Sequence, residues 1–156
     1  MKCAKSTKQK KKWVLLNLKK DDEDSITIVE FNNFTIQRQT KGGIPNLPFV
    51  FIKEAILGKD YDLSLLFPTL ELSEELHIKW KKKPGPVNIL SFPFDEESGE
   101  MILTLAQARI EAKNYDRSYH NHLIFLFIHG CLHLKGMTHG AKMEKEENFY
   151  YPQFKK

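Results

Sequence analysis

The sequence predicts one domain of the α/β (or α+β) class, with a mixed sheet of about four strands around a buried central helix. Short apolar segments typical of strands alternate along the chain with segments of helical periodicity. One helical segment contains a run, residues 123–128, that is apolar on every side, as expected at the centre of a domain. A length of 156 residues and a hydrophobic content of 41% allow one real core and exclude a mainly disordered chain.

The first half of the chain predicts two strands and one helix. Residues 25–31 alternate apolar and polar side chains, which is the period of a half-buried strand. After a break at residues 40–43, a helix is expected from Pro45 to Gly58, because proline is favoured in the first helical turn and glycine just after the last. Residues 61–67 are the second predicted strand, ended by the proline that follows.

Two further strands are predicted in the middle of the chain. Ser73 is the expected start of a short helix that runs towards Trp80. The Pro- and Gly-containing turn at residues 83–86 then leads into an apolar strand, residues 87–92, which a proline ends. After a polar loop, residues 101–105 form the fourth predicted strand.

The last part of the sequence is predicted to be helical. Residues 106–113 suit one helix, and a longer helix, capped by Asp116 or Ser118, carries the apolar run and ends at Gly136. Residues 141–150 form a final amphipathic helix. Since no internal repeat or linker interrupts these elements, we expect them to form one domain.

The charge of the chain is unevenly divided. Residues 1–20 carry eight lysines and no acidic residue, so the remaining 136 residues hold 16 Lys and Arg against 20 Asp and Glu. We interpret residues 1–24 as an arm that is flexible in part and residues 25–156 as the folded domain. The basic part of the arm, residues 2–12, is either a solvated tail or one that adds non-specific attraction to phosphate.

Several observations favour the cytoplasm. No apolar run approaches the roughly 18 residues of a membrane span. The short apolar run near the N-terminus, residues 13–16, is too short for a signal-peptide core. The two cysteines, Cys3 and Cys131, make no disulfide framework, as is usual in a reducing compartment.

Three histidines form a predicted site for one divalent metal ion. His129 and His133 are four residues apart on the long helix, so they lie on one face and their imidazole nitrogens can converge on one ion. Gly136 allows the chain to reverse after the helix, so that His139 can supply a third ligand. Three neutral imidazoles leave a coordination position open, as in a catalytic zinc site. Residues 25–156 are therefore expected to be a metallohydrolase domain.

Other candidate ligands are poorly placed. His122 lies on nearly the same helix face as His129, but seven residues of helix separate them by roughly 10 Å, and His120 is further away. Cys131 points to another side of the helix and is expected to be a packing residue. Nothing in the sequence places His77 at the site.

The histidine spacing equals that of the metzincin proteases, His-Glu-x-x-His-x-x-Gly-x-x-His, in which the glutamate is the general base. Here Gly130 occupies the position of that glutamate. Because a metalloprotease needs this proton acceptor, the metalloprotease interpretation is the least favoured.

A second pattern fits better. Residues 129–139 read HGCLHLKGMTH, and residues 88–94 read NILSFPF. They resemble two motifs of the YbeY family, His-Gly-x-Leu-His-Leu-x-Gly-Tyr-Asp-His and Asn-Val-Leu-Ser-Phe-Pro-Phe. The matching residues of the first motif are His129, Gly130, Leu132, His133, Leu134, Gly136 and His139. The resemblance implies an α/β fold and a metal-dependent endoribonuclease that acts in ribosomal RNA maturation.

Three positions depart from the family pattern. Thr138 stands in place of the aspartate beside the third histidine, so a carboxylate that would orient a ligand is missing, and Met137 replaces the tyrosine. An arginine that the resemblance places in the cleft corresponds to Lys81. Lysine keeps the charge but loses the planar fork that binds phosphate in bidentate fashion.

The resemblance leads to a functional hypothesis. We expect a zinc-dependent endoribonuclease that acts on single-stranded RNA, with ribosomal RNA precursor and the ribosome or ribosomal proteins as partners. Lys81 is the expected catalytic cation, and Lys81, Lys82 and Lys83 are the expected RNA-binding residues. Because no general base is evident, the alternative is a metal-stabilised ribosome- or RNA-binding factor with little catalysis of its own.

Overall fold

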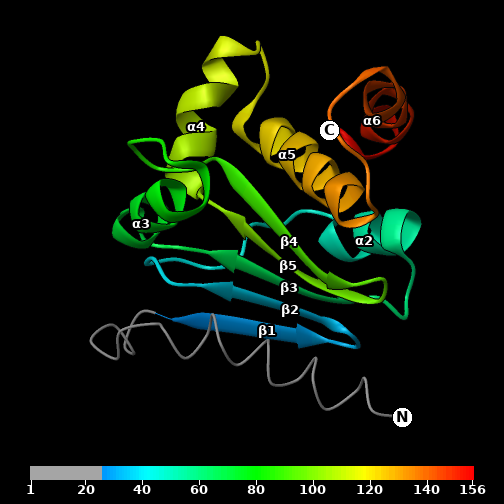
Figure 1. Cartoon of the computed structure of the whole chain (residues 1–156), viewed down its shortest axis with the longest axis horizontal. Coiled ribbons are helices and arrows are strands. Elements are labelled where there is room, and N and C mark those ends of the chain that lie inside the picture. Colours follow the sequence, from blue (N-terminus) through cyan, green and yellow to red (C-terminus); the bar gives the residue numbers. More distant parts are fainter. Residues whose placement is uncertain (1–25) are drawn as a thin grey trace.

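Five strands form one mixed sheet with the order β1-β2-β3-β5-β4 (Figure 1). The computed structural model describes residues 26–156, and the predicted arm, residues 1–24, lies outside them. Strand β2 is antiparallel to β1 and parallel to β3, while β5 is parallel to β3 and antiparallel to β4. The strands are β1 (Thr27–Phe31), β2 (Phe34–Arg38), β3 (Asp62–Phe67), β4 (Ile89–Asp95) and β5 (Ser98–Leu103).

The predicted class, a mixed α/β domain, is confirmed, but the sheet has one strand more than expected. The additional strand is β2, which forms a hairpin with β1 through Asn32 and Asn33. Asn33 has a φ of 58°, a left-handed conformation that asparagine tolerates better than most residues. The Asn-Asn pair between two apolar segments is therefore the signal that predicts this hairpin.

Strand β4 extends to Asp95, although the sequence predicts that Pro93 ends it. Pro93 lies inside the strand, opposite Gly99 of β5. Because β4 pairs with β5 alone among the described strands and is the edge strand there, the missing N–H of the proline leaves no described neighbour unpaired. The polar loop between β4 and β5 is shorter than predicted and consists of Glu96 and Glu97. Asp95 Oδ1 stabilises this turn by accepting from the Glu97 N–H and the Ser98 hydroxyl at 2.8 Å each.

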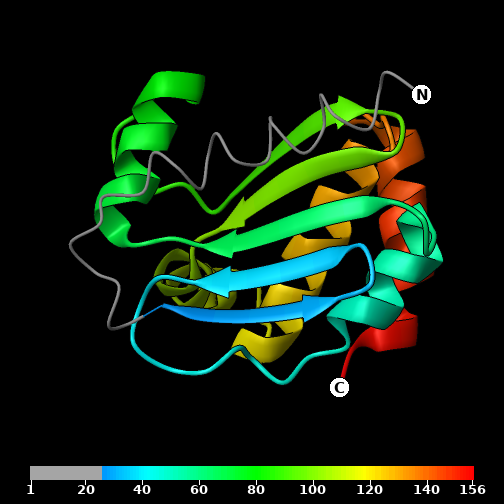
Figure 2. The same ribbon diagram turned by 90° about the horizontal axis from the view of Figure 1, so that it is seen from below.

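Five helices accompany the sheet in the described part of the chain. Helix α5 crosses one face of the sheet, where it packs on β4 and β5 (Figures 1 and 2). Helices α2, α4 and α6 pack around α5, and α3 lies at one end of the strands. The helices are α2 (Phe49–Leu57), α3 (Leu70–Lys81), α4 (Leu105–Asn114), α5 (Tyr119–Leu134) and α6 (Ala141–Phe154).

Some predicted helix starts are wrong. Helix α3 is capped by Thr69, whose hydroxyl accepts from the Leu72 N–H, and Ser73 lies inside the helix. The buried Ser73 hydroxyl instead accepts from the Val87 N–H at 2.9 Å and bonds the Thr104 hydroxyl at 2.6 Å, so it ties α3 to the segments just before β4 and just after β5. Helix α2 likewise begins after Pro48 rather than at Pro45.

The predicted central helix is confirmed as α5. Ser118 caps it by accepting from the Asn121 N–H at 3.1 Å, and Asp116 takes a left-handed turn conformation instead (φ 53°). Ten of its 16 residues are buried, which makes it the centre of the main core. In the core, the Phe127 ring meets the Phe49 ring edge-on at 5.0 Å, a favourable arrangement of two aromatic quadrupoles. Among the described helices, none is both long and apolar enough to span a bilayer.

Two glycines allow the helix and strands to approach closely. At Gly130 of α5, a Cβ atom would lie 2.6 Å from the Ile89 side chain and 2.7 Å from that of Met101. At Gly99 of β5, a Cβ atom would lie 2.6 Å from the Tyr61 hydroxyl and 3.0 Å from the Phe92 carbonyl oxygen. At Gly130 the side chains of the sheet thus pack against the backbone of α5. At Gly99 the neighbouring groups pack against the backbone of β5.

We predict that Gly99→Ala destabilises the domain. The new methyl group meets a backbone oxygen that cannot rotate away, so the free energy of unfolding should fall by about 1–3 kcal/mol, as in other overpacked sites. Urea unfolding, followed by circular dichroism, measures the change. Gly43→Ala is the control, because the methyl group there meets nothing within 4 Å. Equal unfolding midpoints for the two variants would contradict this account of the packing.

Candidate metal centre

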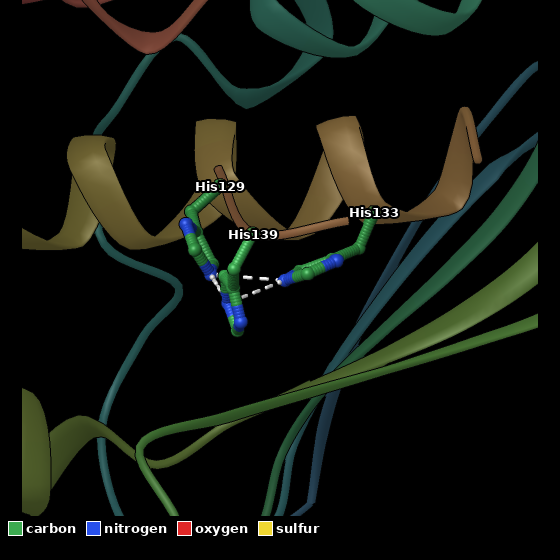
Figure 3. A group of neighbouring side chains, drawn as sticks. All are labelled: His129, His133 and His139. Carbon is green, nitrogen blue, oxygen red and sulfur yellow. Dashed lines mark hydrogen bonds between the residues drawn. The ribbon is translucent and has the colours of Figure 1, made fainter. Parts of the chain in front are cut away.

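The structure brings the three predicted histidines together. His129 and His133 project from one face of α5, and His139 returns to them from the loop before α6 (Figure 3). Their Nε2 atoms lie 3.0, 3.1 and 3.2 Å apart. Nitrogens bound tetrahedrally at about 2.0–2.1 Å from one zinc ion lie roughly 3.3 Å apart, which is close to this triangle. The described residues thus hold three histidines positioned for one metal ion.

The end of α5 explains the return of the chain. Gly136 has a φ of 101°, in the left-handed region that glycine adopts without strain. Its N–H donates to the His133 carbonyl, and the Met137 N–H donates back to the Leu132 carbonyl at 3.1 Å. These bonds satisfy the last carbonyls of the helix and direct the following loop back along its face.

The hydrogen bonds of two rings determine where their protons lie. His133 Nδ1 lies 2.9 Å from the Met137 carbonyl oxygen, which can only accept, so this nitrogen carries the proton. His129 Nδ1 lies 2.7 Å from a Glu147 carboxylate oxygen, with the same consequence. In the neutral rings both Nε2 atoms therefore present lone pairs to each other at 3.0 Å.

Such a pair of acceptors is stable only with a cation between them. Burial and the neighbouring His129 lower the pKa of His133, which favours the neutral ring that a metal ion binds. A divalent metal ion uses the same lone pairs without protonating the rings. Imidazole nitrogens suit zinc, nickel and iron, so the donor set fits a metal centre.

Glu147 is a site residue that the sequence did not reveal. It comes from α6, 18 residues beyond His129, and its carboxylate is mostly buried against that ring. A carboxylate that accepts from a ligand histidine fixes the ring and raises its basicity. Although Thr138 replaces the expected aspartate and is exposed, an orienting carboxylate is present from another element.

The metal centre lies in a cleft of about 720 Å³. Strand β4 and the end of α3 line it on one side, and α4 and α5 line it on the other. Aromatic rings contribute to both sides, with Trp80 and Phe92 packed together at 5.2 Å and Phe125 next to His129 at 6.3 Å. The three histidines thus share one hollow with apolar and charged groups.

The lysine cluster is divided by the end of α3. Lys81, the last residue of the helix, lines the cleft and is close enough to contribute to the lowered pKa of His133. Lys83 also lines the cleft. Lys82 caps the helix in a left-handed conformation, with φ 54°, and is not among the lining residues. The predicted roles of Lys81 and Lys83 therefore agree with their location, whereas that of Lys82 has no support.

The remaining polar candidates have structural partners. Cys131 is completely buried, and burial raises the pKa of its thiol, so it does not join the histidines. His77 lines the cleft but pairs its Nδ1 with the Gly85 carbonyl oxygen at 2.9 Å. The Ser91 hydroxyl donates to the Gly130 carbonyl at 3.1 Å, which ties β4 to α5.

Comparison with known proteins agrees with this site. The sequence profile of the family described as Endoribonuclease YbeY matches residues 19–152. The chain belongs to the YbeY family. A relative from Leifsonia xyli named Endoribonuclease YbeY is 31% identical over 118 residues, which cover 62% of this chain and 77% of the relative. One of the same name from Renibacterium salmoninarum is 28% identical over 134 residues, covering 78% of this chain and 85% of the relative.

The fold is also similar to a solved structure. A solution structure of a Thermotoga maritima protein matches with a TM-score of 0.52 and 19% identity, over 67% of this chain and 77% of the other. At this identity the likeness concerns the fold alone. Membership of the YbeY family, by contrast, supports an endoribonuclease role for the protein.

We predict that Glu147→Gln weakens metal binding. The wild-type protein should bind about one divalent ion per chain, and loss of the carboxylate charge behind His129 should lower the affinity about 10- to 100-fold. Competition with a chromophoric chelator measures both values. Glu144→Gln is the matched control, since Glu144 is an exposed residue of the same helix. If both variants bind zinc as tightly as wild type, Glu147 does not orient His129.

Proposed function

We propose that this protein is a metal-dependent endoribonuclease, with zinc as its resident ion, that cleaves single-stranded RNA during ribosomal RNA processing in the cytoplasm. The observation that supports it best is the convergence of three histidine Nε2 atoms inside a cleft that also presents lysines and aromatic rings. The resemblance to the YbeY family implies the ribosomal RNA precursor and the ribosome as partners. Zinc suits a site of three imidazoles with an open position.

Each part of the cleft has a role in this proposal. His129, His133 and His139 hold the metal, and Glu147 keeps the His129 ring in the required tautomer. When bound, a divalent ion at such a site polarises a phosphoryl oxygen and lowers the pKa of a bound water. Lys81 stabilises the negative charge that develops on the phosphate as the bond is cleaved.

The aromatic rings suit a single strand. Trp80 lines the cleft and is 54% exposed, so its indole ring is accessible to a ligand. Unpaired bases stack on such rings, whereas the bases of a duplex are already stacked on each other. The cleft is therefore better suited to loops and ends of a folded RNA than to its helices.

A second candidate is a metal-stabilised RNA-binding factor with little catalysis of its own. It is favoured by the position of Glu147, the one carboxylate hydrogen-bonded to the three histidines within residues 26–156. That carboxylate lies on the Nδ1 side of His129, away from the nitrogen triangle, and so is poorly placed to accept a proton from a nucleophile.

A metalloprotease is disfavoured by the packing at Gly130. The direction that a side chain would take there leads into Ile89 and Met101. A glutamate, the general base of the metzincin pattern, would have to displace the ends of these two side chains.

A single-turnover assay distinguishes the two candidates. Wild type and His133→Ala are each incubated in excess over a fragment of precursor ribosomal RNA, and cleavage and binding are measured separately. A nuclease requires cleavage by the zinc-loaded wild type that His133→Ala loses. RNA binding without metal-dependent cleavage favours the binding factor. No binding and no cleavage by wild type would rule out both.

We predict that Lys81→Ala lowers single-turnover cleavage about tenfold or more, on the order of 1.4 kcal/mol, because the phosphate loses a cation at the cleft. Metal content and melting temperature should stay unchanged, since Lys81 is exposed. Lys81→Arg should retain or raise the rate, because a guanidinium makes bidentate contact with phosphate.

The control for Lys81 is Lys41→Ala, which removes the same charge from an exposed turn after β2. If both alanine variants lose activity equally, the effect is general electrostatics. Loss of metal or of stability in Lys81→Ala would instead make Lys81 a structural residue.

A further inference from the structure

The cleft continues along α5 beyond the metal centre to a second group of side chains. Arg117 and Tyr115 lie in the turn between α4 and α5, and Phe125 and His122 lie on α5. All four line the same cleft as the three metal-site histidines. We propose that Arg117 and Tyr115 form a subsite that binds a nucleotide further along the strand than the two that flank the cleaved bond. This inference rests on the proposed RNA-cleaving function.

The guanidinium of Arg117 is fixed by its surroundings. Its Cζ atom lies over the Phe125 ring, 3.9 Å from the centroid, with the centroids of the Tyr151 and Tyr115 rings at 5.3 Å and 5.5 Å. The backbone N–H of Arg117 donates to the Ala112 carbonyl at 3.1 Å, which closes the turn. A planar cation held this way loses little conformational entropy when it binds a phosphate.

His122 orients Arg117 without cancelling its charge. Arginine can only donate, so His122 Nδ1 accepts from it at 3.4 Å. The other ring nitrogen, Nε2, then carries the proton and donates to Glu111 at 3.3 Å. Burial lowers the pKa of His122, in agreement with a neutral ring.

Arg117 keeps a free positive charge. Within residues 26–156, no carboxylate lies at ion-pair distance from it. Glu111, the nearest acid in this network, is used by His122 and also accepts from the Asn88 and Gln107 side-chain amides at 3.2 and 3.3 Å. An arginine that is half buried without an acidic partner, in a cleft, is suited to an anionic ligand.

Tyr115 supplies a surface for a base. Its ring stacks on His122, at 5.4 Å between centroids and 16° between planes, and the residue is 61% exposed. One face is therefore supported while the ring remains largely open to solvent. An exposed aromatic ring beside a guanidinium with no acidic partner offers both contacts that a nucleotide needs, stacking for the base and charge for the phosphate.

The position along α5 separates this subsite from the metal centre. His122 and His129 are seven residues apart, roughly 10 Å of helix, and the Phe125 ring lies between them. Within residues 26–156, the Arg117 guanidinium contacts Phe125, His122, Tyr115 and Tyr151, and not the three histidines. It should affect the binding of longer RNA rather than the cleavage step itself.

The test measures binding of two probes to the zinc-loaded full chain. One probe is a single-stranded oligoribonucleotide of about ten nucleotides, and the other is a dinucleotide that is too short to reach both ends. Arg117→Ala should weaken binding of the longer probe roughly tenfold. The slope of the logarithm of its binding constant against the logarithm of salt concentration should become shallower by about one unit. Dinucleotide binding and metal content should match wild type.

Two further variants complete the experiment. Arg109→Ala is the matched control, because Arg109 also stacks on a tyrosine, Tyr119, at 4.0 Å but does not line the cleft. Tyr115→Ala changes an exposed side chain and should weaken the longer probe several-fold with its salt dependence unchanged.

The outcomes separate this inference from the proposed function. If wild type binds neither probe, the proposed function fails. If wild type binds the longer probe and Arg117→Ala and Tyr115→Ala bind it as Arg109→Ala does, the subsite is overturned and the proposed function stands. If Arg117→Ala lowers the melting temperature, its binding data are set aside and Tyr115→Ala is the test. The subsite is then overturned if Tyr115→Ala binds the longer probe as tightly as wild type does.

Discussion

The close contact between α5 and the sheet is the constraint on which the site depends. At Gly130 the backbone of the helix comes so near to the sheet that a Cβ atom there would lie within 3 Å of the Ile89 and Met101 side chains. The Ser91 hydroxyl, which donates to the Gly130 carbonyl, fixes the same contact from the strand. With this face of α5 held against β4 and β5, the face that carries His129 and His133 is directed into the cleft. The position of the candidate metal ligands is thus a consequence of core packing.

The second support of the site comes from α6. Its Glu147 accepts a hydrogen bond from His129, so the last helix is joined to the metal centre as well as to the core. His129 and His133 lie on α5, and His139 lies in the loop that leads to α6. A metal ion bound by all three histidines would therefore link α5 to the start of α6. Binding a metal to such a site stabilises the folded state by mass action, and that stabilisation includes the docking of α6.

The features of this structure that depend on local sequence patterns can be predicted, whereas those that depend on packing between distant elements cannot. The spacing of His129, His133 and His139 and the uniformly apolar α5 are short-range signals, and the structure confirms both. Strand β2 was missed because its tight Asn32–Asn33 turn leaves almost no loop in the sequence, although the asparagines mark it. Glu147 depends on how α6 packs, 18 residues beyond its partner, and no periodicity encodes that. Arg117 was likewise unremarkable until α4, α5 and α6 surrounded it with rings.

The proline in β4 has a consequence for the kind of polymer that the cleft accepts. Strand β4 is the edge of the sheet beside the cleft, and an exposed edge usually invites another extended chain to pair with it. Pro93 offers no N–H, and the register of the strand shifts between Pro93 and Asp95. A polypeptide that paired with this edge could not form a continuous ladder of backbone hydrogen bonds at Pro93. A polynucleotide needs no such ladder, since it is bound through its bases and phosphates.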